Sequence, residues 1–193
     1  MLNSIVGLLD AGIPASTNSY ESIQTIPVTT TTASVTFSSI PSTYKHLQIR
    51  WIARDNRSAT SNNIYWQVGN GSADSGANYS WHLLRGNGSS AIAAGAANAN
   101  YMLLDETSAS AGSNTFGVGV IDILDYADTN KYKTFRTLNG WDNNGSGEID
   151  LWSGSWRNTA AINTIYLYPN SGSFVQYSSF ALYELRGNNA INL

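Results

Sequence analysis

Few side chains in this sequence are able to do acid–base or nucleophilic chemistry. The chain has 193 residues, no cysteine and only two histidines, His46 and His82, each of which falls in a predicted strand. A Ser/His/Asp triad or a multi-histidine metal site needs more of these residues. H-E-x-x-H, G-x-x-x-x-G-K-[ST] and G-x-S-x-G are also absent. We therefore predict no catalytic residue, no metal and no cofactor, and interpret His46 as an ordinary exposed histidine.

Two carboxylates, Asp122 and Asp125, lie close enough in sequence to suggest hydrolysis of a polysaccharide. A glycosidase needs two acids at a set separation, which a sequence alone does not give. The alternative is that Asp122 and Asp125 close a strand at a turn. We favour the turn, and predict that the protein is not an enzyme.

The run from Asp142 to Glu148, Asp-Asn-Asn-Gly-Ser-Gly-Glu, offers oxygen atoms at positions that resemble the start of a calcium loop. Ser153 stands where the bidentate glutamate of such a loop belongs. Asn-Gly and Ser-Gly also suit a hairpin turn into the next strand. The hairpin is the favoured interpretation.

The strand after this turn places acids beside indoles. If the segment is extended, one face carries Glu148, Asp150, Trp152 and Trp156, and the other carries Ile149 and Leu151. Indole rings beside carboxylates suit a sugar-binding surface or a protein interface. The alternative is a change of register near Gly154 that sends both Trp side chains into the core. The candidate glycan or partner contacts are Trp152, Trp156, Asp142, Asn143, Asn144, Glu148 and Asp150.

The elements that position these residues are short strands. The segment Lys45 to Arg54 alternates between apolar and polar residues, with Leu47, Ile49, Trp51 and Ala53 on one face. About eleven such segments follow residue 19, separated by Asn, Gly and Ser clusters, with no helix between them. This pattern predicts an all-β fold in one domain, residues 19–193: an antiparallel β-sandwich with a jelly-roll topology.

The first residues follow a different pattern. Leu2, Ile5, Val6 and Leu9 recur at helical spacing, which predicts a short helix over about residues 4–11 within an N-terminal arm, residues 1–18. A helix of two turns is marginal in water without tertiary contacts. We therefore expect the apolar stripe of this assembly arm to dock on another surface.

Two segments are predicted to be long loops because they are rich in Ala, Gly, Ser and Asn. They are Gly86 to Asn100 and Ser108 to Asn114. Compact domains seldom keep long loops without a use, so both are candidate contact surfaces.

The composition limits the partners. Charged residues make up 12% of the chain and aromatic residues 11%, and the net charge is −3. Neutral hydroxyl and amide groups can be buried against a partner at less cost than ions. Nucleic acid is not expected as a partner, because it requires clustered Lys and Arg. No signal peptide or membrane-spanning segment is recognisable, so we expect a soluble protein that is made in the cytoplasm.

Three stretches together carry a resemblance to a known family: Ser19-Tyr-Glu-Ser-Ile23, the segment from Thr36 to Arg50 (TFSSIPSTYKHLQIR), and the segment from Ser178 to Gly187 (SSFALYELRG). They resemble a family of virion structural proteins of tailed phages, including cyanophages. Asn78 to His82 and Val120 to Lys133 also fit, so the resemblance covers nearly all of the β domain. It brings no catalytic motif with it.

What the resemblance implies is a place on the virion, as a capsid decoration (cement) protein or as part of a tail or head fibre. The single domain and the absence of repeats favour decoration. The alternative is a fibre or receptor-binding protein that recognises host-surface glycans. The expected partners are other virion proteins, such as the major capsid protein, and further copies in a dimer or trimer. Assembly would take place in the host cytoplasm.

Overall fold

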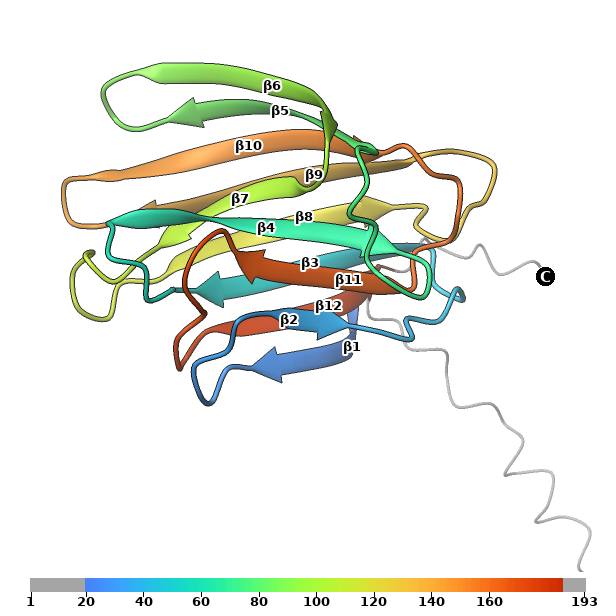
Figure 1. Cartoon of the computed structure of the whole chain (residues 1–193), viewed down its shortest axis with the longest axis horizontal. Coiled ribbons are helices and arrows are strands. Elements are labelled where there is room, and N and C mark those ends of the chain that lie inside the picture. Colours follow the sequence, from blue (N-terminus) through green and yellow to red (C-terminus); the bar gives the residue numbers. More distant parts are fainter. Residues whose placement is uncertain (1–19, 186–193) are drawn as a thin grey trace, which may run out of the picture.

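The computed structural model describes residues 20–185, which form two antiparallel β-sheets packed face to face (Figure 1). The predicted all-β sandwich is confirmed, and the predicted arm, residues 1–18, lies outside the described residues. The strands are β1 (Tyr20–Pro27), β2 (Val35–Phe37), β3 (His46–Ala53), β4 (Ser61–Gly69), β5 (Tyr79–Gly86), β6 (Ala91–Ala99), β7 (Met102–Thr107), β8 (Gly117–Leu124), β9 (Lys133–Asp142), β10 (Gly147–Trp156), β11 (Thr164–Pro169) and β12 (Ser179–Leu185).

The strand order contains a jelly roll. Strands β1-β12-β3-β8 lie side by side in the larger sheet and face the smaller sheet, β2-β11-β4-β7. These eight strands make the two interlocked Greek keys of a jelly roll, as predicted. Two hairpins, β5–β6 and β9–β10, are inserted into it and pair with each other through β10 and β5. They extend the larger sheet to eight strands, in the order β1-β12-β3-β8-β9-β10-β5-β6.

The core lies between the sheets and follows from the period-two pattern of the strands. In β3, Leu47, Ile49, Trp51 and Ala53 are all buried, as predicted from their alternation. They belong to the same apolar cluster as Trp66 and the other inward residues of the smaller sheet. The inserted strands β10, β5 and β6 extend beyond β7, the edge of that sheet, so less of their inner side is covered by apolar partners (Figure 1).

The prediction of a loop over Gly86 to Asn100 is wrong for most of its length. Ala91–Ala99 forms β6, which pairs with β5 at the edge of the larger sheet. Small side chains gave no strand pattern, but a β-ladder is made by backbone groups and needs only an open neighbouring edge. The segment between Thr107 and Phe116 is a loop, as predicted.

The side chain of Arg54, next to the end of β3, binds the loop between Thr107 and Phe116. The Arg54 guanidinium donates hydrogen bonds of 2.7–3.1 Å to four backbone carbonyl oxygens, those of Ala109, Ala111, Gly112 and Thr115. A cation that satisfies four carbonyl groups fixes the loop to the sandwich.

Nothing in residues 20–185 forms a helix long and apolar enough to cross a membrane.

Candidate functional site: an aliphatic sheet face above an arginine–carboxylate cluster

The outer face of the eight-stranded sheet carries large aliphatic side chains that no described residue covers. Six of them are between 41% and 60% exposed: Ile52, Leu84, Val118, Leu138, Ile149 and Leu151. We call these six residues the aliphatic patch. On a sheet with one face in the core, the other face is normally polar. A contiguous apolar area on such a face is typical of an interaction surface.

The strand register brings the patch together. Ile52 of β3 lies opposite Val118 of β8, and Leu151 of β10 lies between Leu138 of β9 and Leu84 of β5. Directly paired residues point to the same side of a sheet, so these side chains adjoin one another across five strands. Three of those strands, β9, β10 and β5, belong to the inserted hairpins.

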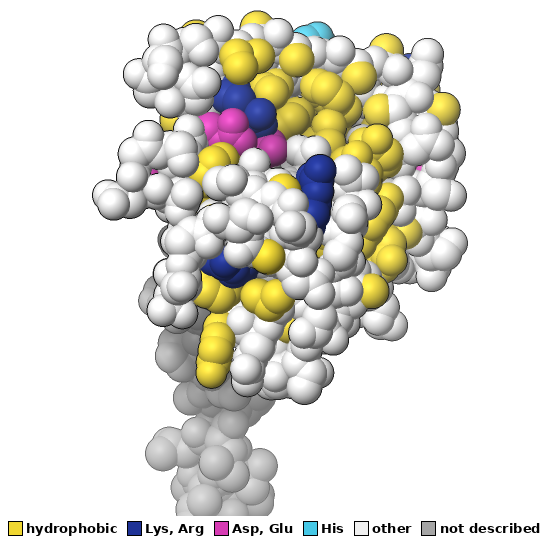
Figure 2. Space-filling model, turned by 60° about the vertical axis from the view of Figure 1, so that its left-hand side comes forward, with side chains coloured by type: hydrophobic (Ala, Val, Ile, Leu, Met, Phe, Trp, Pro, Cys, Tyr) yellow, Lys and Arg dark blue, Asp and Glu magenta, His cyan; other side chains and the backbone are white. Residues whose placement is uncertain are grey.

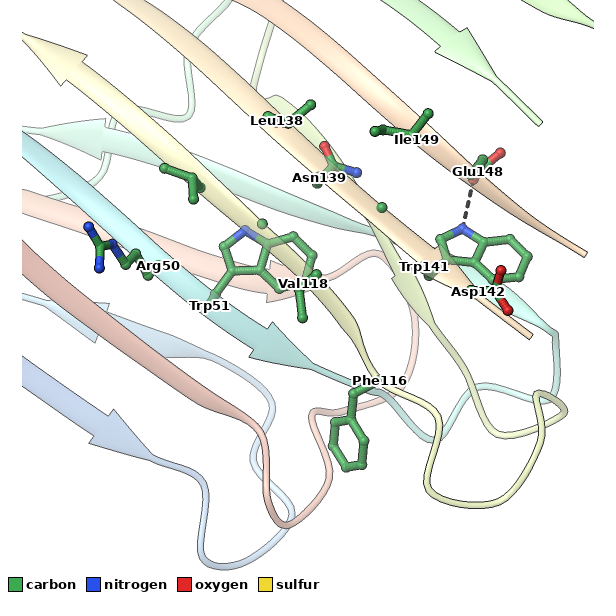
Figure 3. Close-up of a pocket in the computed structure, with 13 residues that line it drawn as sticks. Arg50, Trp51, Phe116, Val118, Leu138, Asn139, Trp141, Asp142, Glu148 and Ile149 are labelled. Carbon is green, nitrogen blue, oxygen red and sulfur yellow. Dashed lines mark hydrogen bonds between the residues drawn. The ribbon is translucent and has the colours of Figure 1, made fainter. Parts of the chain in front are cut away.

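A hollow lies within the patch because one outward position has no side chain. Gly140 stands between Val118 and Ile149 in the ladder. The hollow has a volume of about 650 Å³ and is walled by patch residues, by Phe116 and by Trp141 (Figure 3). Its apolar lining suits a single apolar side chain or short segment of a partner.

Along one border of the patch, polar residues satisfy one another. Gln48 donates to Asp122 at 2.8 Å, and Arg136 pairs with the same carboxylate at 2.8 Å. Arg50 donates to Gln48 at 2.9 Å, and its guanidinium lies 4.7 Å from the centre of the Tyr20 ring. Of the described cations, Arg50 is one with no carboxylate partner, which leaves a positive charge at this border.

On the inner side of the same inserted strands, one arginine is surrounded by three carboxylates. Arg85 of β5 donates to both oxygens of Asp150, from Nε at 2.6 Å and from Nη2 at 3.0 Å. It also pairs with Glu148 at 3.2 Å and with Asp105 of β7. Asn139 donates to Asp150 at 3.1 Å. Figure 2 shows acidic and basic side chains grouped beside a broad area of hydrophobic ones.

This cluster places three carboxylates around a single guanidinium, and the groups are largely buried from solvent. Asp150 is fully buried, and the Asp105 side chain is only 6% exposed. Burial, opposed by the charge of Arg85 and aided by that of Asp150, raises the pKa of Asp105 to about 8. The folded protein therefore retains a proton in the cluster at neutral pH.

The same three carboxylates are the described group whose spacing best suits a metal ion. One oxygen from each of Asp105, Glu148 and Asp150 lies within 4.8 Å of the others. The Arg85 guanidinium already lies among these oxygens and supplies the positive charge. A metal ion would have to displace it, so the arrangement is that of an internal ion-pair network.

Comparison with known proteins adds no relative. No family model, no curated protein and no solved structure matches this chain.

The predicted contact role of Trp152 and Trp156 needs correction. As predicted, they share a face with Glu148 and Asp150, but it is the inner one: Trp152 is 3% and Trp156 1% exposed. Pairing continues without a shift through Gly154, where an added Cβ would lie 2.1 Å from the Met102 side chain. The core continues under the inserted strands, so both indoles and Asp150 are closed to a sugar.

The hairpin residues Asp142, Asn143 and Asn144 lie where the sequence predicted: Asp142 ends β9, and Asn143 and Asn144 lie in the turn to β10. Asn144 and Gly145 both have positive φ, 51° and 115°, the conformation for which Asn-Gly is the preferred pair. Asp142 accepts a hydrogen bond from the Asn144 amide at 2.8 Å, and the Asn143 side chain accepts one from Gly112 at 2.6 Å. These oxygens build the turn rather than a calcium loop.

Glu148 connects the arginine–carboxylate cluster to Trp141, a residue that was not singled out from the sequence. It accepts a hydrogen bond from the indole of Trp141 at 2.9 Å as well as the ion pair from Arg85. A second hollow, of about 370 Å³, lies between Trp141, Asp142 and the β5–β6 turn. Trp141 faces Glu148 across a directly paired position, and this register could be recognised only once the turn was placed.

Asp122 and Asp125 do not act as a catalytic pair in this arrangement. Asp122 lies within β8, at the border of the patch, whereas Asp125 begins the turn after β8 with a φ of 48°. Lys131 and Lys45 bind Asp125 and lower its pKa to about 2. Nδ1 of His46 accepts a hydrogen bond from the Asp125 amide at 2.9 Å, so this histidine helps to hold the turn.

A second buried acid lies in β7, next to Asp105. Glu106 is fully buried beside Asp55, and no described donor reaches either of its carboxylate oxygens. Burial, and then the charge of Asp55, raises the pKa of Glu106 well above its usual value. Protonated Glu106 can donate to Asp55, which relieves the repulsion between them.

Proposed function

We propose that this protein is a non-catalytic structural component of a tailed-phage virion. In this role it decorates the capsid and stabilises the head, and it docks through the outer face of its eight-stranded sheet. The observation that carries the proposal is the aliphatic patch, since side chains of this kind are normally covered in a folded protein.

The energetics of the patch suit a docking surface. Each of the six side chains has about half of its surface still in water. Burying the rest contributes about 1 kcal/mol per side chain, or roughly 6 kcal/mol for the six, before the cost of association. The polar border adds specificity because Asp122, Gln48 and Arg136 are already held in place by one another.

The arrangement of the acids supports a structural role. Asp105, Glu148 and Asp150 surround Arg85, Asp122 is paired with Arg136, and the two lysines neutralise Asp125. Carboxylates held by fixed cations are poor general acids and bases, because the ion pair occupies their oxygen atoms. Asp105, which retains a proton, is only 6% exposed and is therefore closed to a substrate. Such pairing favours the non-enzymatic interpretation.

A fibre or receptor-binding role remains the second candidate, and one feature favours it. Trp141, Asp142 and Glu148 line the smaller hollow at the hairpin ends, which combines an indole with hydrogen-bond acceptors. Trp152 and Trp156, on which the expectation first rested, do not contribute. Trp141→Ala should abolish attachment to host cells without affecting particle assembly if glycans bind there.

The test of the main proposal is the position of the protein on intact particles, seen by electron microscopy with an antibody label. Label spread over the head supports decoration, whereas label confined to the tail or fibre tips contradicts it. A binding assay with particles then tests the face. Leu138→Ser with Ile149→Ser should weaken binding at least about tenfold, which corresponds to about 1.4 kcal/mol. Tyr132→Ser, at an equally exposed aromatic residue before β9, is the matched control.

A further inference from the structure

We propose that residues 2–10 of this same chain cover the aliphatic patch until the protein joins its assembly. The inference deepens the proposed function by naming how the same face is regulated. Only its final step, release of the arm on the particle, rests on that function. Three observations support it: the chemistry of the two surfaces, the reach of the chain and the complementarity of two charges.

The first observation is that the arm and the patch have matching chemistry. Leu2, Ile5, Val6 and Leu9 are spaced i, i+3, i+4 and i+7, so in a helix they form one apolar stripe. A helix over these residues is about 12 Å long, and three adjacent strands span about 10 Å. The stripe therefore fits across β8, β9 and β10, where the patch and its hollow lie.

The second observation is that the described chain begins at the border of this face. Tyr20, the first residue of β1, lies on the outer side, where the Arg50 guanidinium contacts its ring at 4.7 Å. Residues 11–19 can span up to about 30 Å, which is enough to reach any strand of the patch. A tether this short gives a local concentration in the millimolar range. It favours the chain's own arm over the arm of a neighbouring copy.

The third observation is charge. Asp10 is the only charged side chain among residues 1–19. Arg50 is exposed at the border of the patch and forms no ion pair with a described residue. An Asp10–Arg50 pair would place Leu9 near Val120, which adjoins Arg50 in the ladder. The same contact fixes the direction in which the stripe crosses the strands.

Covering the patch has a consequence for assembly. An exposed aliphatic face would make newly made copies associate without order. A tethered arm hides the face at low cost and can be displaced by a larger complementary surface. Docking on the particle then exchanges the arm for the partner.

Disulfide trapping tests the contact, since the chain contains no cysteine. Val6→Cys is combined with Leu138→Cys in the full chain, and the matched control combines Val6→Cys with Thr36→Cys, an exposed position on the smaller sheet. Mild oxidation should give an intramolecular disulfide at least tenfold faster in the first variant than in the control. Equal rates, or disulfide-linked dimers in place of monomers, would overturn the proposal. Leu9→Cys with Val120→Cys repeats the test at a second point.

The trapped protein then separates this inference from the proposed function. If the reduced variant binds particles and the oxidised variant does not, release of the arm is required, as proposed. If both forms bind equally, the regulatory step is wrong. If the disulfide forms but the reduced protein, like wild type, does not bind particles, the arm contact stands and the virion role fails.

Discussion

Removing the positive charge of Arg85 should destabilise the protein far more than removing an exposed arginine. Arg85→Met keeps the apolar stem of the side chain but leaves Asp105, Glu148 and Asp150 without their cation. Breaking a buried ion-pair network from one side costs about 3–5 kcal/mol, because the remaining charges stay desolvated. Arg136→Met is the matched control. The Arg136 side chain is 72% exposed, and its pair with Asp122 contributes about 0–1 kcal/mol.

The pH dependence gives this prediction a second, independent readout. In the folded protein the pKa of Asp105 is raised to about 8, far above its value in an unfolded chain. An acid with a raised pKa in the folded state contributes stability that is complete below about pH 4 and is lost as the pH rises towards 8. Without Arg85 the pKa of Asp105 rises further. The deficit of Arg85→Met relative to wild type should therefore be largest at pH 8 and should shrink towards pH 5.

Urea unfolding followed by tryptophan fluorescence measures both effects, since buried indoles report on the core. The free energies of unfolding of wild type, Arg85→Met and Arg136→Met are compared at pH 5 and pH 8. If the two variants agree within about 1 kcal/mol at pH 8, the cluster is not desolvated as described. A deficit that is equal at both pH values would show that the retained proton is not in this cluster.

Three further substitutions test other parts of the structure. Glu106→Gln should raise the free energy of unfolding at pH 8 by about 1 kcal/mol or more and change it little at pH 5, because burial and the charge of Asp55 disfavour the ionised glutamate. Urea titrations at both pH values measure this difference. Gly154→Ala should cost about 1–3 kcal/mol, because the new Cβ would displace the end of the Met102 side chain and lie 2.9 Å from the backbone oxygen of Ser80, and thermal unfolding should show a lower Tm. Leu138→Ser should lower the free energy of unfolding by about 1 kcal/mol, because the arm buries the half of this side chain that the described residues leave exposed; a loss of less than about 0.5 kcal/mol would mean that nothing covers Leu138 in the free protein and would contradict the arm proposal.

Alternation along the strands made much of the sandwich predictable. Leu47, Ile49, Trp51 and Ala53 were assigned to one buried face because a strand repeats every two residues, and the structure buries all four. The Asn-Gly pair after Asp142 marked a hairpin because few residues accept positive φ. Strand β6 was missed because a run of Ala and Gly shows no alternation of apolar and polar residues. Its backbone nevertheless pairs with β5 like that of any other strand.

In the candidate site, the sequence predicted which side chains of β10 share a face, but not which of the two faces is buried. The sequence showed which residues of β10 share a face, namely the acids with the two tryptophans, and Ile149 with Leu151. It did not show which face is covered. That depends on how the β9–β10 hairpin packs against β7 and β5, which come from distant parts of the chain. Their packing turns Trp152 inward, surrounds Arg85 with acids and leaves Ile149 and Leu151 in water.

The sequence by itself therefore determined the local properties of this protein: its strand periodicity, its turns, its low charge and the helical spacing of its first apolar residues. These depend on neighbours within a few positions, where backbone geometry is fixed by the residues themselves. Tertiary structure alone decided that two inserted hairpins pair with each other and extend one sheet of the jelly roll. The aliphatic patch and the arginine–carboxylate cluster both result from that pairing. The free energy of an exposed or buried side chain is set by contacts between segments far apart in the sequence, which no local pattern contains.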